Sequence, residues 1–295
     1  MLRGGMFPEP VAGHRVGYQP ASGLLWAEGH PSGDKSRLGG PQALRRALSA
    51  LEERLGELDV EIPARRRYSG VCWQTGPPVP GFAGVRRLDL AVDLASATTA
   101  EGLALLAGIA AMRPSGRLAA DVRRQPGGRA VETVSWLGVR GKVARAYDKG
   151  VEACSAPRGE LVRLEDQRRW PREHRRDAVE LTAEYCRSLF QRRFEPLRRA
   201  SKGVIVTNLV PIAERLYAHV EAGELKPGHA LQAIGSLVAE QAGLEFGHRT
   251  TAWRHRRRVQ DLGLVLADGC LEEVEVDLHG VLAEAVDDGV WGDDG

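Results

Sequence analysis

Alternation of apolar and polar residues across Arg86–Leu94 is the sequence feature that most constrains how this chain can fold. Successive side chains of a β-strand point to opposite faces, so a strand here has one apolar face and one polar face, which carries Asp89 and Asp93. An antiparallel sheet with one solvated side shows this pattern. The segment therefore predicts a strand of such a sheet.

Three further segments are short and bounded by turn residues, and each is expected to be a strand: residues 130–138, 142–150 and 158–167. In the second, Tyr147 shares a face with Arg145 and Lys149, and in the third, Glu165 shares a face with Arg163. If these strands neighbour the first, Tyr147, Glu165 and the two aspartates converge on one surface. Alternation alone also fits a half-solvated sheet without an active site, and it favours that structural interpretation.

Helical spacing of apolar residues occurs before, between and after these strands. Pro41–Leu58 has proline in its first turn, and residues 98–112 begin with threonine and place Glu101 three positions later, as in a capped helix. From Trp170 onward the pattern is helical almost to the end of the chain. This order predicts an α+β fold, in which an antiparallel sheet with flanking helices is followed by a mostly helical region.

Charge is distributed unevenly along the chain. Arginines gather between Arg168 and Arg199 and again between Arg254 and Arg258, whereas neither lysine nor arginine follows Cys270. Such asymmetry suggests a negatively charged partner and an acidic tail that competes with it. We divide the chain into a strand-rich domain, a helical region and an acidic tail, with bounds 1–202, 203–285 and 286–295.

Composition and spacing argue against several classes of protein. No apolar run reaches the roughly 18 residues of a membrane span, and the N-terminus lacks the apolar core and cleavage site of a signal peptide. We therefore expect a cytoplasmic protein that does not act at a membrane. The four cysteines lie far apart, and neither H-x-H nor H-E-x-x-H occurs, which argues against a zinc site, a disulfide framework or a histidine-bound metal.

Three segments taken together resemble a known family. These are "RRLDLAVDL" (Arg86–Leu94), "SWLGVRGKVARAYDKGVE" (Ser135–Glu152) and "ELVRLEDQRR" (Glu160–Arg169). They follow in the order of the motifs of the replication initiation factor family, which comprises rolling-circle replication initiators of plasmids and phages, the staphylococcal plasmid initiators among them. The resemblance covers residues 85–169 of the chain.

This resemblance implies an enzyme that nicks and rejoins one DNA strand at an origin. Tyr147 would be the nucleophile, and its attack would leave a 5′-phosphotyrosine link and a free 3′ hydroxyl. Asp89 and Glu165, with Asp93 as a further candidate, would hold a divalent metal. The residues beside Lys149 and after Glu165 depart from the family pattern, so the metal ligands follow less directly than the nucleophile.

The expected reaction explains why a tyrosine, nearby cations and carboxylates would be needed together. A phenol has a pKa of about 10, so it must lose its proton as it attacks, and nearby cations such as Arg145 and Lys149 favour the phenolate. Carboxylates without histidine select hard ions, which predicts Mg2+ or Mn2+ as the cofactor. The positions of Arg145 and Lys149 also fit simple ion pairs with acids on neighbouring strands. Arg140 and Arg163 are candidates for DNA contacts, although Arg140 also fits a turn cap.

The basic segment His248–Gly269 has the features of a recognition helix. Thr250 or Thr251 is a candidate N-cap, Gly263 a candidate end, and residues 264–269 a candidate strand. With a preceding helix, this order resembles a winged helix-turn-helix, in which arginines contact phosphates and base edges of DNA: here Arg254, Arg256, Arg257 and Arg258. A solvated helix face without DNA contacts also fits the pattern.

The expected partners follow from the initiator interpretation. They are origin DNA that is single-stranded or cruciform at the nick site, the host helicase and polymerase, and a second copy of the chain in a homodimer. The alternative is a non-catalytic phage or plasmid DNA-binding regulator with a degenerate catalytic sheet. A tyrosine recombinase is a third interpretation, but the strand-rich first half argues against it. Of the first two, the nicking enzyme alone needs Tyr147 and a metal.

Overall fold

The chain divides into two compact units. The computed structural model describes residues 5–6, 9–19, 24–29, 41–58, 85–112, 120–124, 130–137, 143–150, 159–170, 180–242, 244, 249–267 and 273–287. The first unit contains residues 1–89, 168–189 and 290–295, and the second contains residues 90–167 and 190–289. The division at residues 202 and 285 stays a prediction; residue 202 lies within the second unit, between α4 (Ala183–Ala200) and β9 (Ile205–Thr207).

In its described residues, the first unit contains a small antiparallel sheet, helix α1 and the start of α4. The sheet has the order β1-β2-β3, and its strands are Gly5–Met6, Arg15–Gln19 and Leu24–Glu28. Helix α1 (Pro41–Glu57) confirms the helix predicted from the sequence. Its apolar stripe is buried with residues from around β2, and the core they form consists of Val11, Val16, Leu51 and Leu55.

A five-stranded sheet is the centre of the second unit. Its order is β4-β8-β7-β6-β5, and the strands from β5 to β8 pair antiparallel with their neighbours. The bounds are Arg87–Ala95 for β4, Ala120–Arg124 for β5, Val131–Leu137 for β6, Val143–Asp148 for β7 and Leu161–Arg169 for β8. Four of these strands confirm the sequence prediction, whereas β5 was not predicted. Helices and mostly antiparallel sheets together confirm the α+β class.

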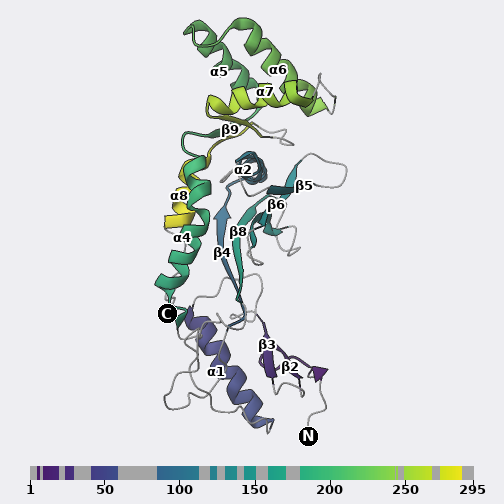
Figure 1. Ribbon diagram of the computed structural model, residues 1–295, viewed down its shortest axis with the longest axis vertical. Coiled ribbons are helices and arrows are strands. Elements are labelled where there is room, and N and C mark those ends of the chain that lie inside the picture. The colour runs from purple at the N-terminus through teal and green to yellow at the C-terminus, as the bar shows by residue number, and fades with distance from the viewer. Residues whose placement is uncertain are drawn as a thin grey trace. The chain divides into compact units, whose positions relative to one another are not determined.

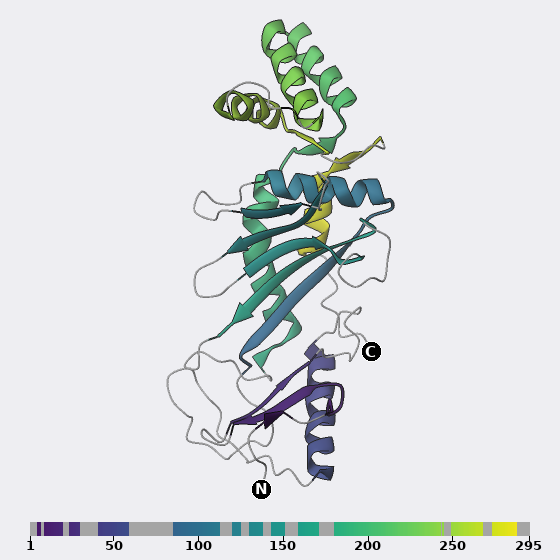
Figure 2. The same ribbon diagram turned by 90° about the vertical axis from the view of Figure 1, so that its right-hand side faces the viewer.

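Helix α2 (Thr99–Ala111) is apolar on every side. Its start confirms the predicted cap: the Thr98 side chain accepts from the Glu101 backbone, and the Glu101 carboxylate accepts from the backbone of Thr98. Such a helix must be buried all round. It contacts β6 and β7, and it also contacts three short strands and α8 (Leu278–Asp287). Figure 1 and Figure 2 show α2 between the five-stranded sheet and these strands.

Close packing of α2 against the short strands depends on a glycine. A Cβ atom at Gly108 would lie 2.5 Å from Cγ2 of Val206 in β9, so any larger residue would push the helix away. The short strands are β9, β10 (Leu264–Leu266) and β11 (Glu275–Asp277). The prediction that the pattern is helical from Trp170 almost to the end is wrong at β9 and β11, because strands this short show no alternation, whereas β10 lies within the candidate strand 264–269.

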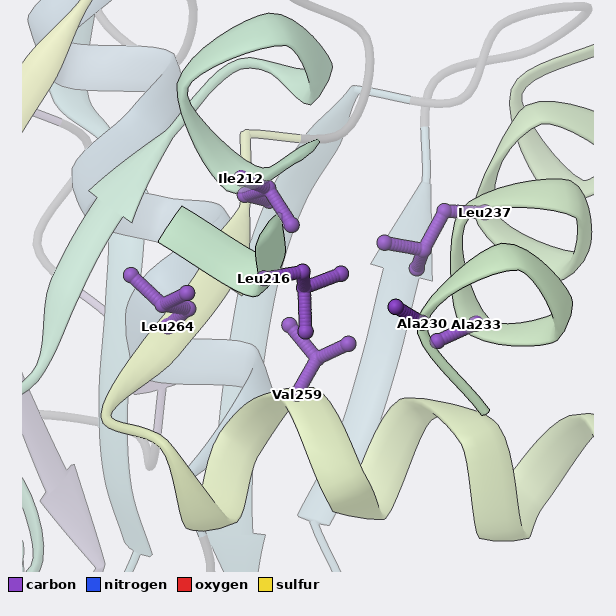
Figure 3. Packing of buried hydrophobic residues seen from close by; sticks show 7 residues of the cluster. All are labelled: Ile212, Leu216, Ala230, Ala233, Leu237, Val259 and Leu264. Atoms are coloured by element: carbon purple, nitrogen blue, oxygen red, sulfur yellow. The ribbon is translucent and has the colours of Figure 1, made fainter. Parts of the chain in front are cut away.

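Three helices and β10 share one apolar core. The helices are α5 (Leu209–Glu221), α6 (Pro227–Ala242) and α7 (Arg249–Asp261). Figure 3 shows that their side chains point toward one another. The buried members of the core are Ile212, Leu216, Ala230, Ala233, Leu237, Val259 and Leu264. This packing fixes the side of α7 that faces inward and leaves its opposite side exposed.

The strands around α7 differ from a simple β-hairpin wing. The small sheet has the order β10-β9-β11; β9 pairs parallel with β10 and antiparallel with β11. The two strands after α7 therefore lie on either side of β9, and this arrangement does not confirm a winged helix-turn-helix. Helix α7 begins at Arg249, so the prediction that Thr250 or Thr251 is its N-cap is wrong. Gly263, with φ +72°, follows the end of the helix as expected.

Candidate active site

Strands β7 and β8 bring the predicted tyrosine and glutamate onto one face of the sheet. Their antiparallel register places Tyr147 opposite Arg163 and Arg145 opposite Glu165. Residues two apart in a strand share a face, so all four side chains lie on the same side of the sheet. Asp93 of β4 joins them through Arg163. We call these residues the Tyr147 cluster: Asp93, Arg145, Tyr147, Arg163 and Glu165.

The hydroxyl of Tyr147 is held by Glu165. It donates a hydrogen bond to Oε2 of Glu165 at 2.9 Å, while Nη2 and Nε of Arg145 donate to Oε1 at 2.6 and 3.0 Å. The Arg145 guanidinium carbon also lies 5.1 Å from the centroid of the Tyr147 ring, within the range of a cation–π contact. Because Tyr147 is 6% and Glu165 5% exposed, this geometry is largely shielded from water.

A second ion pair lies directly beside the tyrosine. Nε and Nη2 of Arg163 donate to the two carboxylate oxygens of Asp93, the second bond being 2.7 Å long. Burial alone would lower the pKa of Arg163, but the hydrogen bond and charge of Asp93 and the proximity of Tyr147 raise it above its usual value. Arg163 is therefore a permanent cation next to the phenol.

The Tyr147 cluster is electrically balanced. Its two guanidinium groups are matched by two carboxylates, and the phenol is the member without formal charge. Burying charges in pairs with several hydrogen bonds limits the cost of removing them from water. Chemically, Glu165 is placed to accept the phenol proton, and the two arginines are placed to stabilise the phenolate or a phosphate group near it.

Two acids that interrupt the apolar face of these strands have structural partners. Asp166, fully buried next to Glu165, pairs with Arg193 of α4 at 3.5 Å between Oδ1 and Nε. Asp148, next to Tyr147, accepts the backbone N–H of Gly159 at 2.7 Å. The polar residues that depart from the family pattern thus contribute to packing on the face opposite the tyrosine.

Three of the site residues predicted in the strand-rich domain are not members of the Tyr147 cluster. Asp89 belongs to the first unit, where its carboxylate accepts from Nε and Nη2 of Arg87 at 3.0 and 2.6 Å. The prediction that Lys149 shares the strand face of Tyr147 is wrong, because β7 ends at Asp148 and a helical turn follows. Lys149 is 7% exposed. Arg140 lies outside the described residues.

The predicted metal ligands do not fit a divalent ion as they are placed. Asp89, Asp93 and Glu165 each bind an arginine, and the second oxygen of Glu165 accepts from Tyr147, so these oxygens already have partners where a metal would need them. Within the described residues, no three His, Cys, Asp or Glu side chains are grouped so that they could hold a metal ion. Binding of Mg2+ or Mn2+ stays a prediction.

The arginines of α7 have unequal surroundings. Arg256 binds Glu240 of α6, and Arg257 pairs with Asp261 of its own helix at 3.0 Å. Arg258 is half-buried, and among the described residues nothing hydrogen-bonds its Nη1 atom. Arg254 is exposed. Two of the four predicted DNA contacts, Arg254 and Arg257, therefore lie on the solvent side of the helix with no partner from another element in the described ranges.

Sequence reasoning missed one exposed aromatic residue on this helix. Trp253 is 51% exposed, although tryptophan is usually well covered. It lies next to Arg254 and one turn before Arg257. An apolar residue outside the apolar stripe of a basic helix is the sequence signal that could have identified it.

Comparisons with protein-family models, curated proteins and solved structures found no match to this chain. None of the helices in the described ranges combines the length and the apolar character needed to cross a bilayer.

Proposed function

We propose that the chain is a rolling-circle replication initiator that nicks one DNA strand through Tyr147. The observation that carries this proposal is the hydrogen bond from the Tyr147 hydroxyl to Oε2 of Glu165, with two guanidinium groups close to the phenol. A nucleophile, a proton acceptor oriented by a third group, and positive charge near the reacting atoms are what phosphoryl transfer to tyrosine requires.

The bonds and protons of the nicking step can be accounted for with the groups of the Tyr147 cluster. The phenol oxygen forms a bond to phosphorus, and the bond from phosphorus to the 3′ oxygen breaks. Glu165 takes the phenol proton, and the departing 3′ oxygen takes up one proton to become a hydroxyl. The product is a 5′-phosphotyrosine link, and rejoining reverses each transfer. Arg145 and Arg163 stabilise the negative charge of the phosphate as the bonds change.

Burial places a condition on this reaction. Because Tyr147 is 6% exposed, a DNA phosphate reaches its hydroxyl only after neighbouring groups move. In this proposal the arginines hold the nucleophile in a paired, inactive arrangement, and the phosphate replaces a carboxylate as the partner of a guanidinium. Origin DNA that is single-stranded or cruciform at the nick site is the proposed substrate. A host helicase and polymerase, a second copy of the chain and a cytoplasmic location complete the proposal.

One observation favours a second function. The Tyr147 cluster is balanced and buried, as expected of a structural network of ion pairs. A non-catalytic DNA-binding regulator that keeps the sheet and acts through α7 would show the same geometry. The two functions differ in one property, which is the covalent link between Tyr147 and DNA.

The decisive experiment compares Tyr147→Phe with the parent chain on a labelled single-stranded DNA library in Mn2+, resolved on a denaturing gel. We expect a slow-migrating, protease-sensitive species that disappears in the variant, while DNA binding is unchanged. Tyr185→Phe, on α4, is the matched control and should retain the species. A parallel reaction in EDTA tests the metal. Persistence of the species in Tyr147→Phe would refute the assignment.

A further inference from the structure

Helix α7 presents a tryptophan and two arginines on one side. Positions four apart lie nearly one above the other on a helix, and adjacent positions are separated by about 100°. Trp253 and Arg257 therefore form a row, with Arg254 beside it. On the opposite side, His255 and Val259 are 6% and 2% exposed. Core packing consequently fixes Trp253, Arg254 and Arg257 as an outward surface, which we call the Trp253 face.

The charges on the Trp253 face are available to a partner. Arg254 is exposed, and no carboxylate in the described ranges pairs with it. Arg257 pairs with Asp261, but both side chains are more than half exposed, and an exposed pair of this spacing contributes little to the stability of a helix. An anion that approaches the Trp253 face can therefore bind both guanidinium groups at little cost.

The exposed aromatic residue on α5 has the opposite surroundings. Tyr217 is 46% exposed and lines a hollow of about 560 Å³ together with Leu209, Ile234, Glu214 and Glu221. Two carboxylates beside the ring repel phosphate groups. Tyr217 therefore provides a natural comparison, because it matches the exposure of Trp253 but not its charge.

We propose that Trp253 stacks on an unpaired base of single-stranded DNA while Arg254 and Arg257 bind the adjacent phosphates. The inference rests on the proposed function, in which the chain acts on locally unpaired origin DNA. Aromatic rings stack on the faces of bases, and these faces are accessible in a single strand but covered within a duplex. Arginines bind phosphates in both forms. Trp253 should therefore contribute to binding of single strands and not of duplexes.

The test measures fluorescence anisotropy of a labelled single strand of mixed sequence and of the same strand annealed to its complement. Trp253→Ala should weaken single-strand binding by about 5- to 150-fold, as expected for the loss of one base–aromatic stack. Duplex affinity should change by less than about 2-fold, since the phosphate contacts remain. Trp253→Phe should retain most of the single-strand affinity, and Tyr217→Ala should alter neither.

Two outcomes overturn the inference: an unchanged single-strand affinity of Trp253→Ala, or an equal loss with both forms of DNA. Thermal unfolding of each variant checks that the helix is intact, and Trp253→Phe supplies a second variant that keeps an aromatic ring. The assay involves no cleavage, so it is independent of Tyr147. If the parent chain forms no covalent species but Trp253→Ala loses single-strand affinity selectively, the proposed function alone is rejected. If the parent chain nicks DNA but Trp253→Ala binds single strands as before, this inference alone is rejected.

Discussion

The Tyr147 cluster and the Trp253 face contain the same kinds of residue in opposite surroundings. Each combines an aromatic ring with two arginines. In the cluster, carboxylates from neighbouring strands neutralise the guanidinium groups, and the tyrosine is almost fully covered. On the Trp253 face, the aromatic ring is half exposed. Arg257 pairs there with the exposed Asp261, and no carboxylate in the described ranges pairs with Arg254. Burial with partners orients a side chain, whereas exposure without strong partners makes it available to a ligand.

The largest effect is expected on the nicking rate, which tests whether the buried cluster is catalytic. Glu165→Gln keeps the shape of the side chain but removes its ability to accept the phenol proton. Loss of a general base should slow formation of the covalent species by about 10²- to 10⁴-fold. The measurement is single-turnover accumulation of the protein–DNA species. Glu160→Gln, at an exposed position just before β8, is the control. An unchanged rate in Glu165→Gln would show that the base lies elsewhere.

The next effect concerns stability. Arg163→Leu leaves the carboxylate of Asp93 without its partner, and removing one member of a buried pair costs about 3–5 kcal/mol of the free energy of unfolding. Arg254→Leu, on the Trp253 face, should change it by less than about 0.5 kcal/mol. Urea denaturation measures both. Replacing Asp93 and Arg163 together with leucine should recover part of the loss. Equal costs for the two single variants would contradict the contrast between the regions.

The smallest effect is on the salt dependence of DNA binding. Arg254→Gln and Arg257→Gln should each reduce the slope of log affinity against log salt by about 1, because each removes one phosphate contact. On DNA without a nick site, Arg145→Gln should leave that slope unchanged, since Arg145 stays bound to Glu165 within the cluster. Binding titrations at several salt concentrations provide the slopes. A reduced slope in Arg145→Gln would place a phosphate of such DNA at the cluster as well.

The face of the sheet that carries Tyr147 could be predicted from the sequence because strand alternation has a period of two. That period places Tyr147 with Arg145, and Glu165 with Arg163, as the register confirms. It does not show where a strand ends, and Lys149 was therefore placed on a strand that stops at Asp148. Strands of three residues, such as β9, have too few positions to show any period.

Partners of charged residues could not be predicted in the same way. The ion pair of Arg163 with Asp93 joins positions that are 70 residues apart, and it exists because β4 and β8 are neighbours in the sheet. Sequence spacing identified Asp93 and Glu165 as acids on one surface. It cannot distinguish an acid that binds a metal from one that binds an arginine, because both occupy the same positions in an alternating strand. Pairing with arginine depends on strand order, which alternation does not encode.

The position of α2 between two sheets has a consequence for biosynthesis. Residues 99–111 leave the ribosome well before the strands and helix that cover their second side, which extend to residue 287. Until that segment has been made, an apolar helix surface has nothing of its own chain to contact. Incomplete chains with exposed apolar surface are prone to aggregate. The three short strands and α8 thus complete the burial of α2, and we expect nascent chains that stop before β11 to be recognised by chaperones as unfinished.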